Sequence, residues 1–196
     1  MPDSVFVEDT ALVLDEIAVL CQPGAESRRG EVASIGDVLG RFRKLESIAL
    51  PGTLDGGDLL RVGEVIYAGV TTRSNPEGIE QLRSIVADYG YTVETVPAKG
   101  CLHLKSAVTE VAPNTLLANP DWVDPSAFPD CELIRIDDRE PHAANALRVA
   151  DSVVYPASFP RTAEKLIGHG IDLIRIDVSE LQKAEGAVTC CSLVVT

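Results

Sequence analysis

Five polar side chains, four of which could carry charge, transfer protons or act as a nucleophile, recur at nearly even intervals along the chain. Consecutive members are 42 to 48 residues apart, in the order Glu8, Asp55, His103, Asn145 and Cys190. Each is followed, four and five positions later, by two apolar residues of the kind that predict a buried strand. These side chains therefore occupy the same place in successive repeating units.

A cysteine and a histidine that meet at the centre of such a repeat, together with carboxylates, would form a nucleophilic catalytic site. Cys190 would be the nucleophile and His103 the proton carrier, and a carboxylate such as Asp55 would fix the imidazole tautomer. Each residue also has an ordinary interpretation. A histidine in an apolar strand is more often a hydrogen-bonded structural residue, a buried cysteine usually behaves as a small hydrophobe, and the string LDGGD is typical of a turn.

A buried group of carboxylates requires a cation, and a guanidinium is the planar cation that matches carboxylates best. Glu8 and Asp9 are adjacent in the string FVEDT, where a solvated pair of charges is the alternative interpretation. Arg28 and Arg73 each follow the second strand of a unit. They are expected either as surface charges or as partners for a substrate carboxylate.

The elements that must position these residues repeat as strand, strand, helix and strand (β-β-α-β). In the second unit, Asn75 and Pro76 predict a helix start, because asparagine caps helices and proline fits the first helical position. The fourth unit predicts a shorter helix from Pro160, and the first a helical run from Ser27 to about Arg43. The third unit contains the proline-rich string DWVDPSAFPD, which allows only a turn or two. Repeated around an axis, such units would bring the five side chains together.

The composition predicts one compact domain spanning residues 1–196 and narrows the class of partner. The 17 basic and 30 acidic residues give a net charge of −13, which argues against binding to nucleic acid or an anionic membrane surface. An acidic surface would favour a small cationic substrate, although it more often serves solubility. No apolar run could span a membrane, and the acidic N-terminus is unlike a signal peptide. The five cysteines form no C-x-x-C pair, so a cytoplasmic location with reduced thiols is expected.

Six strings identify a resemblance to a known family. In order, and at these spacings, PDSVFVEDT, PGAESRR, LDGGD, TTRSNPEG, LHLKSAV and EGAVTCCS resemble the dimethylarginine dimethylaminohydrolase family of the guanidine-modifying (pentein) superfamily. The resemblance extends from Asp3 to the end of the chain. It implies an α/β propeller of β-β-α-β modules with pseudo-fivefold symmetry. It also implies hydrolysis of monomethyl- and asymmetric dimethylarginine to citrulline and a methylamine, without a cofactor or a metal ion.

The resemblance also assigns roles by position. In the catalytic group that it implies, Cys190 is the nucleophile and His103 is the general acid and base. Asp55 orients the histidine. The implied contacts along the length of the substrate are Asp3, Glu8 and Asp9. Those to its α-carboxylate are Arg28 and Arg73, and its α-amino end would meet the backbone near Ala184.

Two choices within the superfamily rest on single residues. Arginine deiminases resemble this chain around the histidine but carry an aspartate where Lys105 stands, so the string HLKS favours methylated arginines. Cys190 is preferred to Cys191 because adjacent residues of a strand face opposite ways. The alternatives that remain are an arginine deiminase-like or other guanidine or amidine hydrolase, and an inactive propeller that acts as a binding partner.

The family has a further segment before the string that matches PDSVFVEDT, whereas this sequence begins with Met1 directly before that string. The resemblance therefore predicts four modules and one additional strand starting at Cys190, with the N-terminal part of one module lacking. The expected explanations are an N-terminal truncation of the sequence, such as a misplaced start, or another chain that closes the gap. Unpaired edges next to the gap would favour self-association, so a homo-oligomer is a further expectation.

Overall fold

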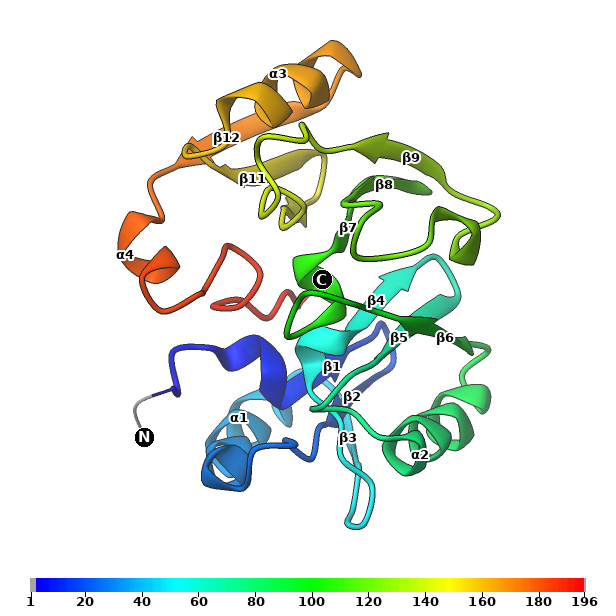
Figure 1. Cartoon of the computed structure of the whole chain (residues 1–196). Helices are drawn as coiled ribbons and strands as arrows, with labels where there is room; N and C mark the ends of the chain where they lie inside the picture. Colours follow the sequence, from blue (N-terminus) through cyan, green and yellow to red (C-terminus); the bar gives the residue numbers. More distant parts are fainter. Residues whose placement is uncertain (1–2, 196) are drawn as a thin grey trace.

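The computed structural model describes residues 3–195, which form four modules arranged around a common centre (Figure 1). Each module contains a three-stranded sheet. Grouped by module, the strands are β1 (Ala11–Val13), β2 (Ile17–Leu20) and β3 (Lys44–Ser47); β4 (Leu59–Val62), β5 (Val65–Val70) and β6 (Thr92–Pro97); β7 (Val108–Ala112), β8 (Thr115–Ala118) and β9 (Glu132–Arg135); β10 (Leu147–Val149), β11 (Ser152–Pro156) and β12 (Asp172–Ile176).

The four sheets share one pairing pattern. The first and second strands of each module are antiparallel neighbours, and the second and third are parallel. A parallel pair needs a crossover connection, and three of the modules use a helix for it. This repetition confirms the predicted α/β class of β-β-α-β modules.

The crossover helices are α1 (Val32–Leu39), α2 (Pro76–Ala87) and α3 (Pro160–Gly168). Helix α2 begins as predicted, because the side chain of Asn75 accepts a hydrogen bond of 2.8 Å from Gly78 N and proline follows at the first helical position. The third module has only the short 3-10 turn η5 (Pro125–Ala127), as its prolines predicted. In the first module, the 3-10 turn η2 (Glu26–Glu31) precedes α1.

The hydrophobic core is divided among the interfaces between successive modules. One buried cluster joins the first module to the second, another the second to the third, and a third the third to the fourth. Each of these three clusters is therefore built by two successive modules, which stabilise each other through it. Among residues 3–195 no such cluster joins the fourth module to the first.

The C-terminal segment runs from the short helix α4 (Ser179–Gln182) back to the centre of the molecule (Figure 1). The predicted strand beginning at Cys190 is wrong, since residues 188–191 form a turn and residues 192–195 have no regular structure. The turn is closed by a hydrogen bond of 2.9 Å from Ser192 N to Thr189 O. A strand needs a paired strand to satisfy its backbone groups. This segment packs against β1 through Leu193, but no strand of the described residues pairs with it.

None of the helices in residues 3–195 is both long enough and apolar enough to cross a membrane.

Candidate active site

Short 3-10 turns at the start of three modules carry the predicted site residues. The turns are η1 (Val7–Thr10), η3 (Gly56–Asp58) and η4 (Leu104–Ser106), and each is followed within two residues by the first strand of its module. Glu8 and Asp9 lie in η1, Asp55 directly precedes η3, and His103 directly precedes η4. Turn η3 contacts both η1 and η4. The repeat in the sequence thus brings these four side chains together.

His103 is buried between two carboxylates. Its Nε2 lies 3.1 Å from Asp55 Oδ2, and its Nδ1 lies 3.7 Å from Asp9 Oδ1. Burial disfavours the imidazolium, but the hydrogen bond to Asp55 and the charges of Asp9 and Asp58 outweigh it, so the pKa of His103 is raised above its ordinary value. A histidine in this position is suited to hold and release a proton near neutral pH.

Asp55 is completely buried and held at both carboxylate oxygens. Its Oδ1 accepts a hydrogen bond of 2.8 Å from Gly24 N, while its Oδ2 faces His103. Arg73 Nη1 lies 4.0 Å from the same Oδ2. These contacts fix the carboxylate that in turn fixes the ring orientation of His103.

Asp58, the second carboxylate of the LDGGD string, has a structural role that the sequence did not assign. It is fully buried and accepts hydrogen bonds from Leu104 N at 2.9 Å, Thr71 Oγ1 at 2.7 Å and Ser74 Oγ at 2.6 Å. Burial raises the pKa of Asp58, although these donors and the charge of His103 oppose the rise. Its bond to Leu104 anchors the residue that follows His103.

His103 and Cys190 line the same cavity, which has a volume of about 570 Å³. The other lining residues come from the third and fourth modules and the C-terminal segment, and include Trp122, His142 and Asn145. Burial, followed by the charge of Glu8, raises the pKa of Cys190 to about 11. Cys191 does not line this cavity. The strand that justified the preference for Cys190 does not form, so this preference stays a prediction.

Arg28 is buried, and protein groups occupy its guanidinium. It forms an ion pair with Asp9 and another, at 2.8 Å, with Glu31 Oε2. It also donates to the carbonyl oxygens of Asp3, at 3.3 Å, and Phe6, at 2.8 Å. The side chain of Asp3 itself is exposed. Neither Asp3 nor Arg28 lines the cavity that holds His103 and Cys190.

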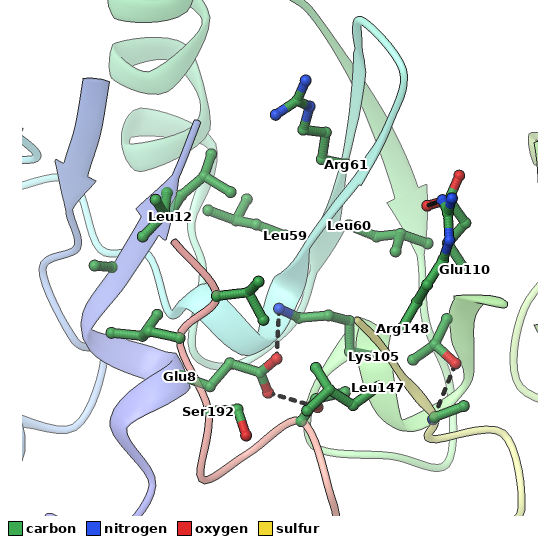
Figure 2. Close-up of a pocket in the computed structure, with 17 residues that line it drawn as sticks. Glu8, Leu12, Leu59, Leu60, Arg61, Lys105, Glu110, Leu147, Arg148 and Ser192 are labelled. Atoms are coloured by element: carbon green, nitrogen blue, oxygen red, sulfur yellow. Dashed lines mark hydrogen bonds and ion pairs between the residues drawn. The ribbon is translucent and has the colours of Figure 1, made fainter. Parts of the chain in front are cut away.

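Glu8 lies behind Cys190 rather than in the cavity with it. Figure 2 shows its carboxylate between Lys105 and the C-terminal segment, in a smaller pocket of about 200 Å³. Lys105 Nζ is 2.6 Å from Glu8 Oε1, and Thr189 Oγ1 donates to Glu8 Oε2 at 2.8 Å. Both carboxylate oxygens are therefore occupied by protein groups.

The two remaining predicted contacts differ in their surroundings. Arg73 Nη1 is buried, has no hydrogen-bond acceptor and lies 4.0 Å from Asp55 Oδ2. Like Asp3 and Arg28, Arg73 does not line the cavity that holds His103 and Cys190. Ala184 is exposed, but Glu185, Gly186 and Ala187 line the cavity. The structure therefore places the backbone next to Ala184, rather than Ala184 itself, at the cavity wall.

Donor atoms of Asp9, Asp55 and His103 lie within 4.8 Å of one another and are the group best placed to hold a metal ion. Each of these donors already has a protein partner. An Asp55–His103 hydrogen bond also requires a proton between the two atoms, which a metal would displace. Hydrogen bonding thus accounts for the arrangement.

Two lining residues carried no functional signal in the sequence. Trp122 and His142 make an edge-on ring contact with centroids 5.1 Å apart, and both line the cavity. They lie on loops outside the repeated positions. Asn145, by contrast, belongs to the repeat, and it lines the cavity as the position of its unit predicts.

Comparisons with known proteins agree with this geometry. No protein-family model matches the sequence. The chain is 41% identical over 194 residues to the N(G),N(G)-dimethylarginine dimethylaminohydrolase of Pseudomonas aeruginosa, a match that covers 98% of this chain and 76% of the relative.

Solved structures of this kind also match. A Cys-to-Ser mutant of the Pseudomonas aeruginosa enzyme, complexed with citrulline, has a TM-score of 0.89 and 40% identity, and the match covers 94% of this chain and 73% of that one. A His-to-Gly dimethylarginine dimethylaminohydrolase, as an adduct with S-methyl-L-thiocitrulline, has a TM-score of 0.93 and 39% identity, covering 97% and 76%. With its fold, its central histidine and cysteine, and this identity over nearly its whole length, the chain belongs to the dimethylarginine dimethylaminohydrolase family, within the pentein superfamily of guanidine-modifying proteins.

Proposed function

We propose that this protein hydrolyses monomethyl- and asymmetric dimethylarginine to citrulline and methylamine or dimethylamine. The observation that carries the proposal is that His103 and Cys190 open into one cavity, with buried carboxylates behind the histidine. Two ligand-bound relatives have an altered cysteine or histidine and contain citrulline or a thiocitrulline adduct. A cysteine and a histidine are thus the residues that were altered in these ligand-bound relatives.

In the first step, the Cys190 thiolate attacks the guanidinium carbon and a C–S bond forms, while the electron pair of the C=N bond moves to nitrogen. His103 donates a proton to the methylated nitrogen, the C–N bond breaks, and methylamine leaves. The product is a thiouronium in which the substrate carbon is bonded to Cys190. The raised pKa of His103 suits it to supply this proton.

In the second step, His103 accepts a proton from water as the water oxygen attacks the thiouronium carbon. The C–S bond then breaks, the Cys190 thiolate is regenerated, and the proton left on the new oxygen passes to solvent, which gives the ureido group of citrulline. Asp55 keeps the ring of His103 in one orientation through both steps, since it faces Nε2 at 3.1 Å. No electrons are gained or lost by the protein.

Arg73 stays a proposed contact for the substrate carboxylate, because its Nη1 lacks a hydrogen-bond acceptor. This nitrogen is buried beside Asp55 and would have to move to reach the cavity. The segment next to Ala184 could meet the α-amino group through backbone oxygens. Asp9 would influence the substrate through His103. Asp3, Glu8 and Arg28 are proposed substrate contacts with less support. Glu8 and Arg28 would first have to break their ion pairs with Lys105 and Asp9.

Citrulline formation from asymmetric dimethylarginine, monomethylarginine and arginine tests the proposal. We expect one equivalent of dimethylamine or methylamine for each citrulline from the methylated substrates. Cys190→Ser should lower the rate at least about a thousand-fold, whereas the adjacent Cys191→Ser should retain most activity. Absence of citrulline from both methylated substrates would reject the proposal, and faster release of ammonia from arginine would favour an arginine deiminase.

A labelling experiment separates an inactive binding protein from an enzyme. We expect a positively charged haloamidine to modify Cys190 much faster than a neutral alkylating agent of similar size at pH 7, because the carboxylates attract the cation. Equal rates, or modification centred on Cys191, would reject the guanidinium site itself.

A further inference from the structure

A buried polar network holds Thr189, the residue before Cys190, by hydrogen bonds. Lys105 Nζ pairs with Glu8 Oε1 at 2.6 Å, and Glu8 Oε2 accepts a hydrogen bond of 2.8 Å from Thr189 Oγ1 (Figure 2). Glu8 and Thr189 are buried, and the Lys105 side chain is only 17% exposed. A charge pair this well shielded from solvent acts over longer distances than one at the surface.

Asn145 closes the network from another module. Its Nδ2 donates to Thr189 Oγ1 at 2.8 Å and to Lys105 O at 3.0 Å, and its Oδ1 accepts from Thr189 N at 3.1 Å. In addition, Glu8 N donates to Cys190 O at 3.1 Å. The turn that carries the thiol is thus tied to the first, third and fourth modules at once.

This network forms the wall between the two pockets. Lys105, Glu8 and Thr189 line the smaller pocket, whereas Cys190 and Asn145 line the large cavity with His103. A substrate in the large cavity would therefore meet the thiol, with the Lys105–Glu8 pair behind it. The pair can influence the reaction only through Cys190 and the turn that carries it.

We propose that Lys105 is a positioning residue for Cys190. Through Glu8 and Thr189 it fixes the turn that carries the thiol, and its charge cancels the negative charge that Glu8 would otherwise present directly behind that thiol. The proposal rests on the proposed function, in which Cys190 is the nucleophile. It gives Lys105 a part in the reaction although this side chain lies outside the cavity.

The charges around Cys190 have known signs. After burial, Glu8 is the group that raises the pKa of Cys190 most, and Asp9 raises it further, whereas Lys105 lowers it. Asp9 is paired with Arg28, and His103, His142 and Glu185 line the cavity in front of the thiol. Removing Lys105 should therefore make the thiolate harder to form, and removing Glu8 should make it easier.

The test measures how fast iodoacetamide modifies Cys190 between about pH 6 and pH 10, because the thiolate is the species that reacts. Peptide fragmentation distinguishes Cys190 from Cys191. We expect Lys105→Met to slow the reaction about tenfold at neutral pH, which corresponds to a rise of about one pH unit in the midpoint. Glu8→Gln should speed it by a similar factor. The double variant should return close to the wild-type profile, since it removes both charges.

Lys183→Met is the matched control. Lys183 pairs with Glu180 at 2.7 Å on the surface, next to the segment that lines the cavity, so its loss removes the same charge without touching the network. This control should leave the profile unchanged. Circular dichroism would show which variants fold. If Lys105→Met does not fold, Lys105→Arg must keep the wild-type profile and Glu8→Gln must still speed the reaction.

Shifts of Lys105→Met and Glu8→Gln in the same direction, or the absence of shifts in folded proteins, would overturn the proposal. Alkylation does not require turnover. Opposite shifts without methylarginine hydrolysis would therefore reject the proposed function and leave the arrangement of charges standing, whereas hydrolysis without shifts would reject the role of Lys105 alone.

Discussion

At the scale of single residues, the centre of the molecule balances burial against charge. His103 is removed from water, which alone would keep it neutral, but Asp55 and Asp9 face its two ring nitrogens. The effect of the carboxylates exceeds that of burial, so the pKa of His103 is raised. In the folded protein the imidazolium is therefore more stable than in the unfolded chain, and this stabilisation is present at pH below the ordinary histidine pKa of about 6.5 and is lost as pH rises through the folded value.

Asp55→Asn should lower the pKa of His103 by at least about one pH unit, because the amide keeps a hydrogen-bonding group but removes the negative charge. The chain has three histidines, so a proton NMR titration of the imidazole signals can follow each one. A matched spectrum of the wild-type protein under the same conditions is the reference. An unchanged midpoint for His103 would show that Asp55 is not the main source of its raised pKa.

The contact between Asp55 and His103 could be predicted from the sequence, because equal positions in a repeat are neighbours at the axis. The environment of Arg28 could not. Its partner Glu31 lies three residues away in a 3-10 turn that the periodicity read as helix, and its second partner Asp9 comes from a different turn. A spacing pattern in the sequence locates a charged residue but does not show which oppositely charged residue pairs with it in the folded protein.

At the scale of elements, the close approach of 3-10 turns decides the geometry. A Cβ on Gly56 would lie 2.0 Å from Glu8 O and 2.8 Å from Ala11 O, and both are backbone atoms that cannot rotate away. The glycines of LDGGD are therefore required where η3 meets η1. The turn interpretation of this string is correct, since Gly56–Asp58 form a 3-10 turn.

Gly56→Ala should lower the free energy of unfolding by about 3 kcal/mol, since the two turns must separate to admit a methyl group. Gly168→Ala is the matched comparison, because nothing lies within 4 Å of a Cβ at this last residue of α3. It should stabilise the protein slightly or have no effect. Urea denaturation of both variants gives the two values, and equal losses would contradict the steric argument.

Helix α2 could be predicted closely and the C-terminal strand could not, for a physical reason. A helix satisfies its hydrogen bonds within one segment, so the cap at Asn75 and the apolar stripe behind it suffice to define its start. A strand depends on a partner elsewhere in the chain. The residues after Cys190 have strand-like periodicity, but no strand of the described residues forms a ladder with them.

At the scale of the whole molecule, the outer strand of the fourth module is a sheet edge that carries exposed apolar residues. β12 pairs only with β11 (Figure 1). Ile174 and Ile176 on this strand and Ile167 on α3 are exposed. An edge strand with exposed isoleucines is a surface on which two copies can associate.

We expect association that increases with protein concentration, measured by light scattering. Ile174→Lys should reduce it and change the free energy of unfolding by no more than about 0.5 kcal/mol, since the site is at the surface. Val38→Lys, which changes an equally exposed apolar residue on α1, is the control. A wild-type protein that stays monomeric at all concentrations, or an equal effect of both lysines, would show that this edge is not an association surface.

The position of Trp122 gives the protein a built-in optical reporter. It is the single tryptophan of the chain, and its indole lines the cavity that holds His103 and Cys190. Emission excited in the indole band therefore comes from one location, beside the proposed substrate. A ligand that displaces water from the cavity would shift this emission, so fluorescence of unlabelled Cys190→Ser protein would report occupancy directly, without any chemistry taking place.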